Sequence, residues 1–128
     1  MSAAIEAIAP GDISYRLSIV VRRVVRVGVG ALGQCRFDPG TYIYIGSARR
    51  NLRARLERHL GLRPRHPHWH IDYLLDAPGV DIDGVETFAL EECVLAACSP
   101  GAIVHPGFGS SDCTRGCGSH LRYGGREG

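Results

Sequence analysis

A chain of 128 residues with 45% hydrophobic and 22% charged residues can bury an apolar core, and this composition excludes a disordered chain. The best candidate for a membrane span, residues 17–29, is interrupted by three arginines, so no segment is long and apolar enough. The net charge of +2 does not by itself select a partner, and residues 1–10 lack the basic start of a signal peptide, so we expect a cytoplasmic protein.

The first predicted elements are strands. Runs of β-branched residues at 15–21 and 24–29 predict a hairpin joined by Arg22-Arg23, and Asp38-Pro39-Gly40 predicts a turn. Residues 41–46 then alternate with a strict period of two, with tyrosines on one face and isoleucines on the other. We expect the isoleucines of this strand to face the core and the tyrosines to line the opposite side.

A helix is expected directly after this strand. Ser47 is placed to cap a helix from about residue 48 to 60, which Gly61 ends, and leucines four residues apart form its buried stripe. Arg55 and His59 are also four residues apart, so they share one side of the helix at the edge of that stripe. We therefore expect both side chains where the helix meets the sheet, within reach of the tyrosines.

The second half of the chain predicts short helices and strands without a regular alternation. In chain order we expect a helix at 70–75, a strand near 85–89, a helix at 91–98, short strands at 102–104 and 120–123, and a glycine- and serine-rich loop at 107–119. This mixture predicts an α+β fold in which helices flank a small antiparallel or mixed sheet. The length predicts one domain over residues 1–128, with its core at about 13–123 and loose ends.

Charge is distributed unevenly along the chain. Residues 49–65 contain seven arginines and one acidic residue, whereas residues 72–92 contain seven acidic residues and no basic one. A basic segment beside an acidic one is what a phosphate-binding site next to a cation site needs, although two solvated faces have the same pattern. The residues that we expect at a nucleic-acid surface are Ser47, Arg49, Arg50, Arg53, Arg58, His68, Trp69 and His70.

The strand and helix after the turn resemble the GIY-YIG nuclease superfamily. Tyr44-Ile45-Gly46, followed by Ser47-Ala48 and by Arg55 and His59 on a helix, is similar to the second half of its motif. Residues 68–75, 92–93, 107–113 and 119–121 resemble a small, mostly uncharacterised branch of that superfamily. Some members of this branch are fused to an endonuclease III-type repair enzyme. The resemblance covers residues 15 to 123 and implies a GIY-YIG-like fold.

The resemblance also implies five catalytic residues. Tyr15 and Tyr44 would correspond to the tyrosines of the two motif halves. Arg55 and His59 would match the helical arginine and histidine, and Glu92 would match the carboxylate that binds the metal. Three features depart from the family: an isoleucine stands two residues before Tyr15 in place of glycine, the stretch between the two tyrosines is longer, and the late asparagine is missing.

Two functions are compatible with these residues. The first is a metal-dependent endonuclease that hydrolyses DNA and would act in repair. In it, Glu92 rather than Glu86 or Glu91 holds Mg²⁺ or Mn²⁺, and Arg55 binds a phosphate oxygen. A tyrosine would take a proton from water, and because free tyrosine titrates at about pH 10, this role needs a pKa lowered by Arg55, the metal or both. His59 would relay a proton or orient the tyrosine. The second is a nucleic-acid-binding module with little or no activity that docks DNA for a partner repair enzyme.

A cysteine pair near the end of the chain is compatible with a structural metal. Cys113, Cys117 and His120 are three potential Zn²⁺ ligands at close spacing, with His105 or Cys93 as a fourth. The alternative is a pair of reduced thiols in a glycine-rich loop. Both interpretations are retained at this point.

Overall fold

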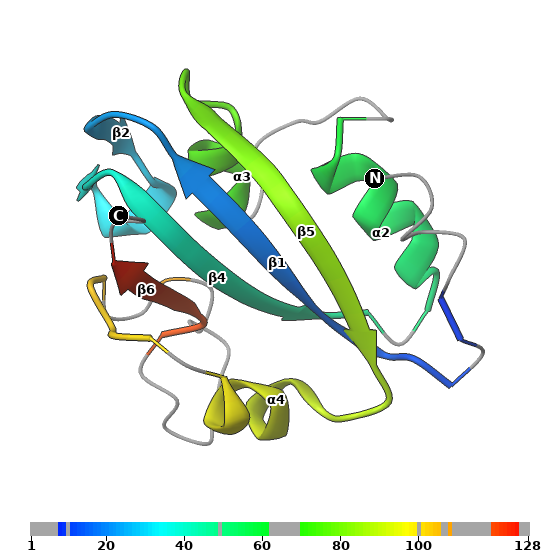
Figure 1. The fold of residues 1–128 in the computed structure, drawn as a ribbon. Helices are drawn as coiled ribbons and strands as arrows, with labels where there is room; N and C mark the ends of the chain where they lie inside the picture. The colour runs from blue at the N-terminus through cyan, green and yellow to red at the C-terminus, as the bar shows by residue number, and fades with distance from the viewer. Residues whose placement is uncertain are drawn as a thin grey trace.

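The computed structural model describes residues 8–9, 11–48, 50–61, 70–99, 101–105, 108 and 119–125. Strands and helices are mixed along this part of the chain, which confirms the α+β class (Figure 1). The elements in chain order are β1 (Ser14–Val21), β2 (Val25–Gly28), a 3-10 turn (Gly30–Leu32), β3 (Gln34–Phe37), β4 (Gly40–Ser47), α2 (Leu52–His59), α3 (His70–Leu75), β5 (Val80–Phe88), α4 (Glu92–Cys98) and β6 (Leu121–Gly125).

The main sheet has four strands in the order β5-β1-β4-β6, and every neighbouring pair is antiparallel. β2 and β3 form a separate two-stranded sheet. The predicted hairpin between residues 15–21 and 24–29 is therefore wrong. β1 pairs with β4 on one edge and β5 on the other, so neither edge is left for the strand that follows it in sequence.

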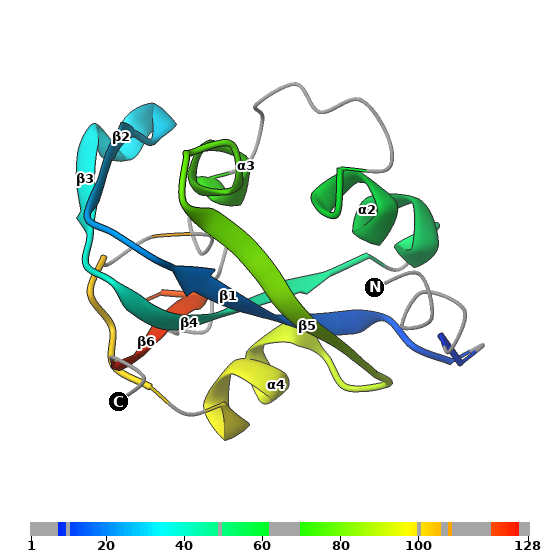
Figure 2. The same cartoon turned by 45° about the horizontal axis from the view of Figure 1, so that its top comes forward.

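Helices cover both faces of the main sheet (Figure 2). α2 and α3 lie on one face, and α4 lies on the other. The first face carries the main core, to which the two helices contribute Leu52, Leu56, Ile71 and Leu74. On the second face Leu95 and Ala96 of α4 pack in a smaller cluster against Ile45 of β4.

The two faces of β4 correct the prediction about its alternation. Ile45 does face a core, but it is the smaller one beneath α4. Tyr42 and Tyr44 are only 1% and 6% exposed and belong to the main core. The tyrosines therefore line a buried interface between the sheet and the two helices above it, because both faces of this interior strand are covered.

The helix after β4 begins later than predicted. β4 continues through Ser47, and Asn51 has a left-handed backbone with φ of 57°, so α2 starts at Leu52. Ser47 consequently belongs to the strand and does not cap the helix. Gly61, with φ of 80°, follows the last turn as expected.

Most of the other predicted elements agree with the sequence in kind and shift at their ends. The helix at 70–75 is confirmed, α4 begins at Glu92, and β5 starts earlier than the predicted strand near 85–89. Residues 102–104 form no strand, and Ala102 makes only an isolated bridge with Tyr123 of β6. The predicted loop at 107–119 lies outside the described residues except for Phe108 and Ser119. Among the helices that the structure describes, none has the length and apolar character to cross a membrane.

Candidate active site

Tyr15, near the start of the interior strand β1, lies directly opposite Gly46 of β4. The phenol packs so closely across this glycine that a Cβ at position 46 would lie 2.3 Å from the Tyr15 hydroxyl oxygen and 2.4 Å from its Cζ. Any side chain at position 46 would displace the ring, which is 1% exposed. The glycine of the Tyr-Ile-Gly stretch is therefore what permits this orientation of Tyr15.

His59, the last residue of α2, reaches the same phenol. Its Nε2 lies 2.8 Å from the Tyr15 hydroxyl oxygen, and the tautomer of the imidazole decides which group donates. The ring of Tyr44 lies beside both, with its centroid 6.3 Å from that of Tyr15 and 6.4 Å from that of His59. The two tyrosines and the histidine that the sequence singles out thus form one buried cluster.

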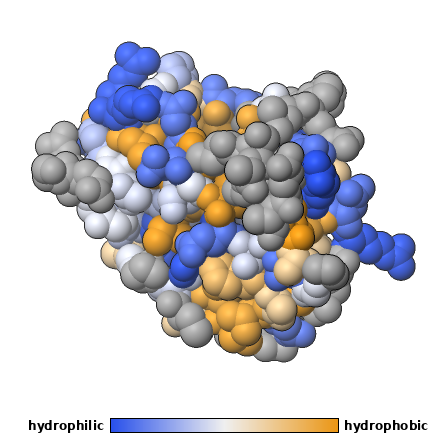
Figure 3. Space-filling model, turned by 45° about the vertical axis from the view of Figure 1, so that its right-hand side comes forward, coloured by the Kyte–Doolittle hydropathy of each residue, from blue (hydrophilic) through white to orange (hydrophobic). Residues whose placement is uncertain are grey.

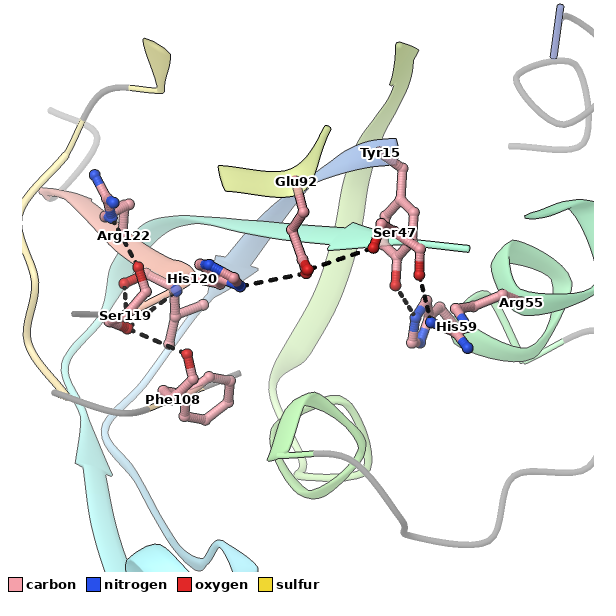
Figure 4. Close-up of polar contacts among 10 residues, drawn as sticks. Tyr15, Ser47, Arg55, His59, Glu92, Phe108, Ser119, His120 and Arg122 are labelled. Carbon is pink, nitrogen blue, oxygen red and sulfur yellow. Dashed lines mark hydrogen bonds and ion pairs between the residues drawn. The ribbon is translucent and has the colours of Figure 1, made fainter. Parts of the chain in front are cut away.

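Arg55 and Ser47 link this cluster to the carboxylate of Glu92. Arg55 Nη1 donates a hydrogen bond of 2.5 Å to the Ser47 carbonyl oxygen. The Ser47 hydroxyl donates to Glu92 Oε2 over 3.3 Å. Figure 4 shows Ser47 between Glu92 on one side and Arg55 and His59 on the other. The predicted arginine and glutamate therefore reach one place from helices on opposite faces of the sheet.

Glu92 is the first residue of α4, and its side chain is 29% exposed. Its second oxygen, Oε1, lies 3.2 Å from Nδ1 of His120, a residue that is 1% exposed and directly precedes β6. Each carboxylate oxygen thus has its own side-chain partner (Figure 4). The sequence assigns His120 to a zinc site and Ser47 to a nucleic-acid surface, and their contacts with Glu92 were missed. The only signal for His120 was its place in the Ser119-His120-Leu121 stretch of the resemblance.

The tyrosine pKa values differ from the expectation. Burial raises the pKa of Tyr15 well above its usual value of 10.0, nearby Tyr44 raises it further, and the charge of Arg55 and its hydrogen bond to the phenol act in the opposite direction. Burial, followed by the negative charge of Glu92, also raises the pKa of Tyr44, against which Arg55 acts. Arg55 therefore acts to lower both pKa values, but the effect of desolvation is larger, so both pKa values stay above the usual value.

A divalent cation at this cluster would be held by Glu92. Carboxylate oxygens are the ligands that hard cations prefer, and the partly exposed side chain leaves room for the waters that such cations retain. Glu86, one alternative, is paired with Arg16 at 3.0 Å on neighbouring strands. No group of three His, Cys, Asp or Glu side chains suited to a metal occurs within the described ranges. The donor set fits one hard cation bound by one carboxylate and water.

The predicted nucleic-acid contacts on α2 divide into two kinds. Arg50 is exposed, and Arg53 is 60% exposed with its Nε 3.8 Å from Glu57 on the same helix. Arg58 instead donates a 2.7 Å hydrogen bond to Asp72, whose side chain is fully buried, and so joins α2 to α3. Arg50 and Arg53 are therefore available to a phosphate backbone, whereas Arg58 has a structural partner.

Several other predicted residues lie on α3 or beyond the described part of the chain. His70 is half-buried, with its ring 5.5 Å from that of Phe108. The predicted residues outside the described ranges are Arg49, His68, Trp69, Cys113 and Cys117. The zinc site therefore stays a prediction, and among its proposed ligands only His120 and the candidate fourth ligands His105 and Cys93 are described.

The surface near α4 differs in character from that of α2. The lower part of Figure 3, in the position of α4, shows an apolar surface, and Leu90 and Val94 are each 41% exposed there. A phosphate backbone gains nothing from apolar side chains. The exposed arginines at the start of α2 are the better contacts for a nucleic acid.

Comparison with known proteins assigns the chain to a family without assigning an activity. No curated protein and no solved structure matches the sequence. A family model described as "Domain of unknown function DUF123" matches residues 14–127, a range that includes all the residues of the cluster around Tyr15 and Glu92. The protein therefore belongs to the DUF123 family.

Proposed function

We propose that this protein is a metal-dependent endonuclease of the GIY-YIG type, which hydrolyses phosphodiester bonds in DNA. The observation that carries the proposal is the convergence of two phenols, an imidazole, a guanidinium and a carboxylate, contributed by β1, β4, α2 and α4. These five residues are Tyr15, Tyr44, Arg55, His59 and Glu92. They are the residues that the GIY-YIG resemblance marks as catalytic, and they lie far apart in sequence.

Proton transfer would begin at Tyr15. Attack by water forms one P–O bond and breaks the bridging one, so the attacking water must lose a proton, and the leaving oxygen takes a proton from solvent water. Because the pKa of Tyr15 is raised, its hydroxyl would accept the water proton while passing its own proton to His59 Nε2, 2.8 Å away. This relay requires the neutral Nδ1–H tautomer of His59 and needs no resident phenolate.

Charge would be handled by Arg55 and Glu92. Arg55 is half-buried, so a contact with a non-bridging phosphate oxygen strengthens as negative charge develops in the transition state. Glu92 would hold Mg²⁺ or Mn²⁺ through its carboxylate. Such a cation supplies polarisation of the phosphate and neutralisation of the leaving oxygen when bound. Arg50 and Arg53 would contact the backbone on either side of the cleaved bond, which gives affinity without base recognition.

Cleavage of labelled single- and double-stranded DNA with Mg²⁺ or Mn²⁺ tests the proposal. Arg55→Ala and Glu92→Ala are expected to lower the cleavage rate by at least about 100-fold, as removal of one electrostatic contact does in other enzymes. Arg36→Ala is the matched control, because Arg36 is an exposed arginine on β3 that is paired with Asp38, and β3 lies across the molecule from α2 (Figure 2). Equal background cleavage by wild type, Arg55→Ala and Glu92→Ala would refute the nuclease proposal.

A nucleic-acid-binding module with little or no activity is the second candidate. The raised pKa values of both phenols and the isoleucine in place of the family's first glycine favour it. It predicts DNA binding that survives chelation of metal and weakens with salt. Arg53→Ala would remove one phosphate contact, so the slope of log affinity against log salt concentration would become shallower by about one. Binding that disappears on chelation would count against this candidate.

A further inference from the structure

The carboxylate of Glu92 has a side-chain contact at each of its oxygens before any cation binds. Ser47 donates to Oε2 over 3.3 Å, and His120 Nδ1 lies 3.2 Å from Oε1. Glutamate is a flexible side chain, and Glu92 is 29% exposed, so nothing in its own backbone position fixes the carboxylate. The two partners are the last residue of β4 and the residue directly before β6.

His120 is itself fixed in place by the backbone. Its N–H donates to the Phe108 carbonyl over 2.8 Å, and its carbonyl accepts from the Ile45 N–H over 2.9 Å. The residue is 1% exposed, and it continues the pairing of β6 with β4 by one position. The backbone of His120 is therefore fixed, and burial limits the movement of its imidazole beside Glu92, whereas the Ser47 hydroxyl can rotate.

We propose that His120 is a positioning residue: its Nδ1, 3.2 Å from Oε1 of Glu92, would donate a hydrogen bond to that oxygen as the carboxylate turns toward a divalent cation, and so would orient the carboxylate. This inference rests on the proposed function, because it assumes that Glu92 is the cation ligand. A partner of this kind outside the direct ligands changes metal affinity by about 10- to 100-fold when it is removed. His120 acts through Glu92 and touches neither the phosphate nor the attacking water.

Two substitutions at position 120 separate this role from others. His120→Leu fills the buried site without a hydrogen-bond donor. His120→Asn keeps an N–H donor at about the position of Nδ1, because the amide nitrogen of asparagine overlays that ring atom. The amide oxygen of asparagine can itself bind a hard cation, so rescue by asparagine shows that a polar group is needed at this position. Whether Nδ1 of His120 carries a proton then separates hydrogen bonding to Glu92 from direct ligation through that nitrogen.

The proposal is tested by titrating the protein with Mn²⁺ in the absence of DNA. The electron paramagnetic resonance signal of free Mn²⁺ reports how much of the ion is bound. We expect Glu92→Gln to abolish tight binding, His120→Leu to weaken it by about 10-fold or more, and His120→Asn to remain within about threefold of wild type. Wild-type affinity in His120→Leu, or an equal loss in His120→Leu and His120→Asn when both are folded by circular dichroism, would overturn it.

A second measurement does not depend on how the variants fold. Long-range ¹H–¹⁵N correlation spectra of wild-type protein with labelled histidine report which ring nitrogen of His120 carries a proton. A protonated Nδ1 is expected, and a bare Nδ1 would overturn the proposal. If the wild type and the variants bind Mn²⁺ with the predicted order of affinities but the wild type does not cleave DNA, the nuclease function alone is refuted. Failure of the proposal about His120 and failure of the proposed function are therefore distinguishable.

Discussion

Gly46→Ala is the substitution whose effect the structure predicts most closely. Gly46 lies opposite Tyr15 in the β1–β4 pairing, and a Cβ there would come within 2.3 Å of the phenol oxygen. Ordinary contact for a Cβ begins at 3.4 Å, so the ring must move by roughly 1 Å. Tyr15 is 1% exposed, and its surroundings are packed, so this movement cannot occur without cost.

The magnitude follows from two contributions. Overpacking of a buried site costs about 1–3 kcal/mol. A displacement of about 1 Å would also stretch the 2.8 Å contact between Tyr15 and His59 beyond hydrogen-bonding range, which costs about 1 kcal/mol. Gly46→Ala should therefore lower the free energy of unfolding by about 3 kcal/mol. A fold of this size retains enough stability to remain folded at 25 °C in many cases, since domains have about 5–15 kcal/mol.

Urea denaturation followed by circular dichroism measures this loss, and Gly84→Ala provides a matched control. Gly84 is also a strand glycine, in β5, but a Cβ there would meet Ser18 Cβ at an ordinary 3.6 Å. Alanine should be neutral or slightly stabilising at position 84, because it removes backbone freedom from the unfolded chain. DNA cleavage by Gly46→Ala should fall together with stability, whereas Gly84→Ala should cleave as wild type does.

The reasoning fails if the two alanine variants have the same free energy of unfolding. It also fails if Gly46→Ala is destabilised but Tyr15→Leu, which removes both the phenol oxygen and Cζ, does not reduce that loss in the double variant. In either case the close packing of Tyr15 against position 46 would not determine the orientation of the phenol.

Three further predictions concern the phenols and the ion pairs. Tyr15→Phe should lower the cleavage rate by about 100-fold or more and the free energy of unfolding by only about 1 kcal/mol; equal cleavage by the variant would exclude a role for the hydroxyl. Burial raises the pKa of Tyr15 and Tyr44 above their usual 10.0, so the unfolded chain loses these two protons at lower pH than the folded protein does. The contribution of the phenols to the free energy of unfolding should therefore be constant below about pH 10 and fall above it by about 1.4 kcal/mol per pH unit for each phenol. Urea denaturation at several pH values measures this, and a constant or rising stability above about pH 10 would contradict it. Arg58→Leu should cost about 3 kcal/mol, because it removes the Arg58 guanidinium from the fully buried Asp72 carboxylate, whereas Arg53→Ala should cost less than about 0.5 kcal/mol. Similar losses in the two variants would show that the Arg58–Asp72 pair does not join α2 to α3.

Local patterns predicted the parts of the fold that local physics determines. The alternation at 41–46 predicted β4, and the leucine spacing predicted α2, because periodicity reports directly which side chains are buried. The hairpin failed because strand pairing is decided by distant partners. Pairing of β1 with β4 and β5 involves sequence separations that no turn signal reports.

The site followed the same division. Arg55 and His59 were predicted to face the tyrosines from their spacing on one helix, and His59 indeed contacts Tyr15. The contact of His120 with Glu92 and the pair of Arg58 with Asp72 join separate elements, so the sequence offered only their residue types. The tyrosine pKa was misjudged for a related reason, because burial is set by the tertiary fold and outweighs one nearby arginine.

The most direct measurement is anomalous diffraction from a crystal that contains the protein, Mn²⁺ and a short DNA strand with a non-hydrolysable phosphate. It would locate the cation and the phosphate in the same structure. The proposed chemistry predicts a manganese peak bonded to Glu92, with the phosphate between Arg55 and the Tyr15 hydroxyl. Manganese bound elsewhere with Glu92 unoccupied, or DNA lying on another surface, would contradict it.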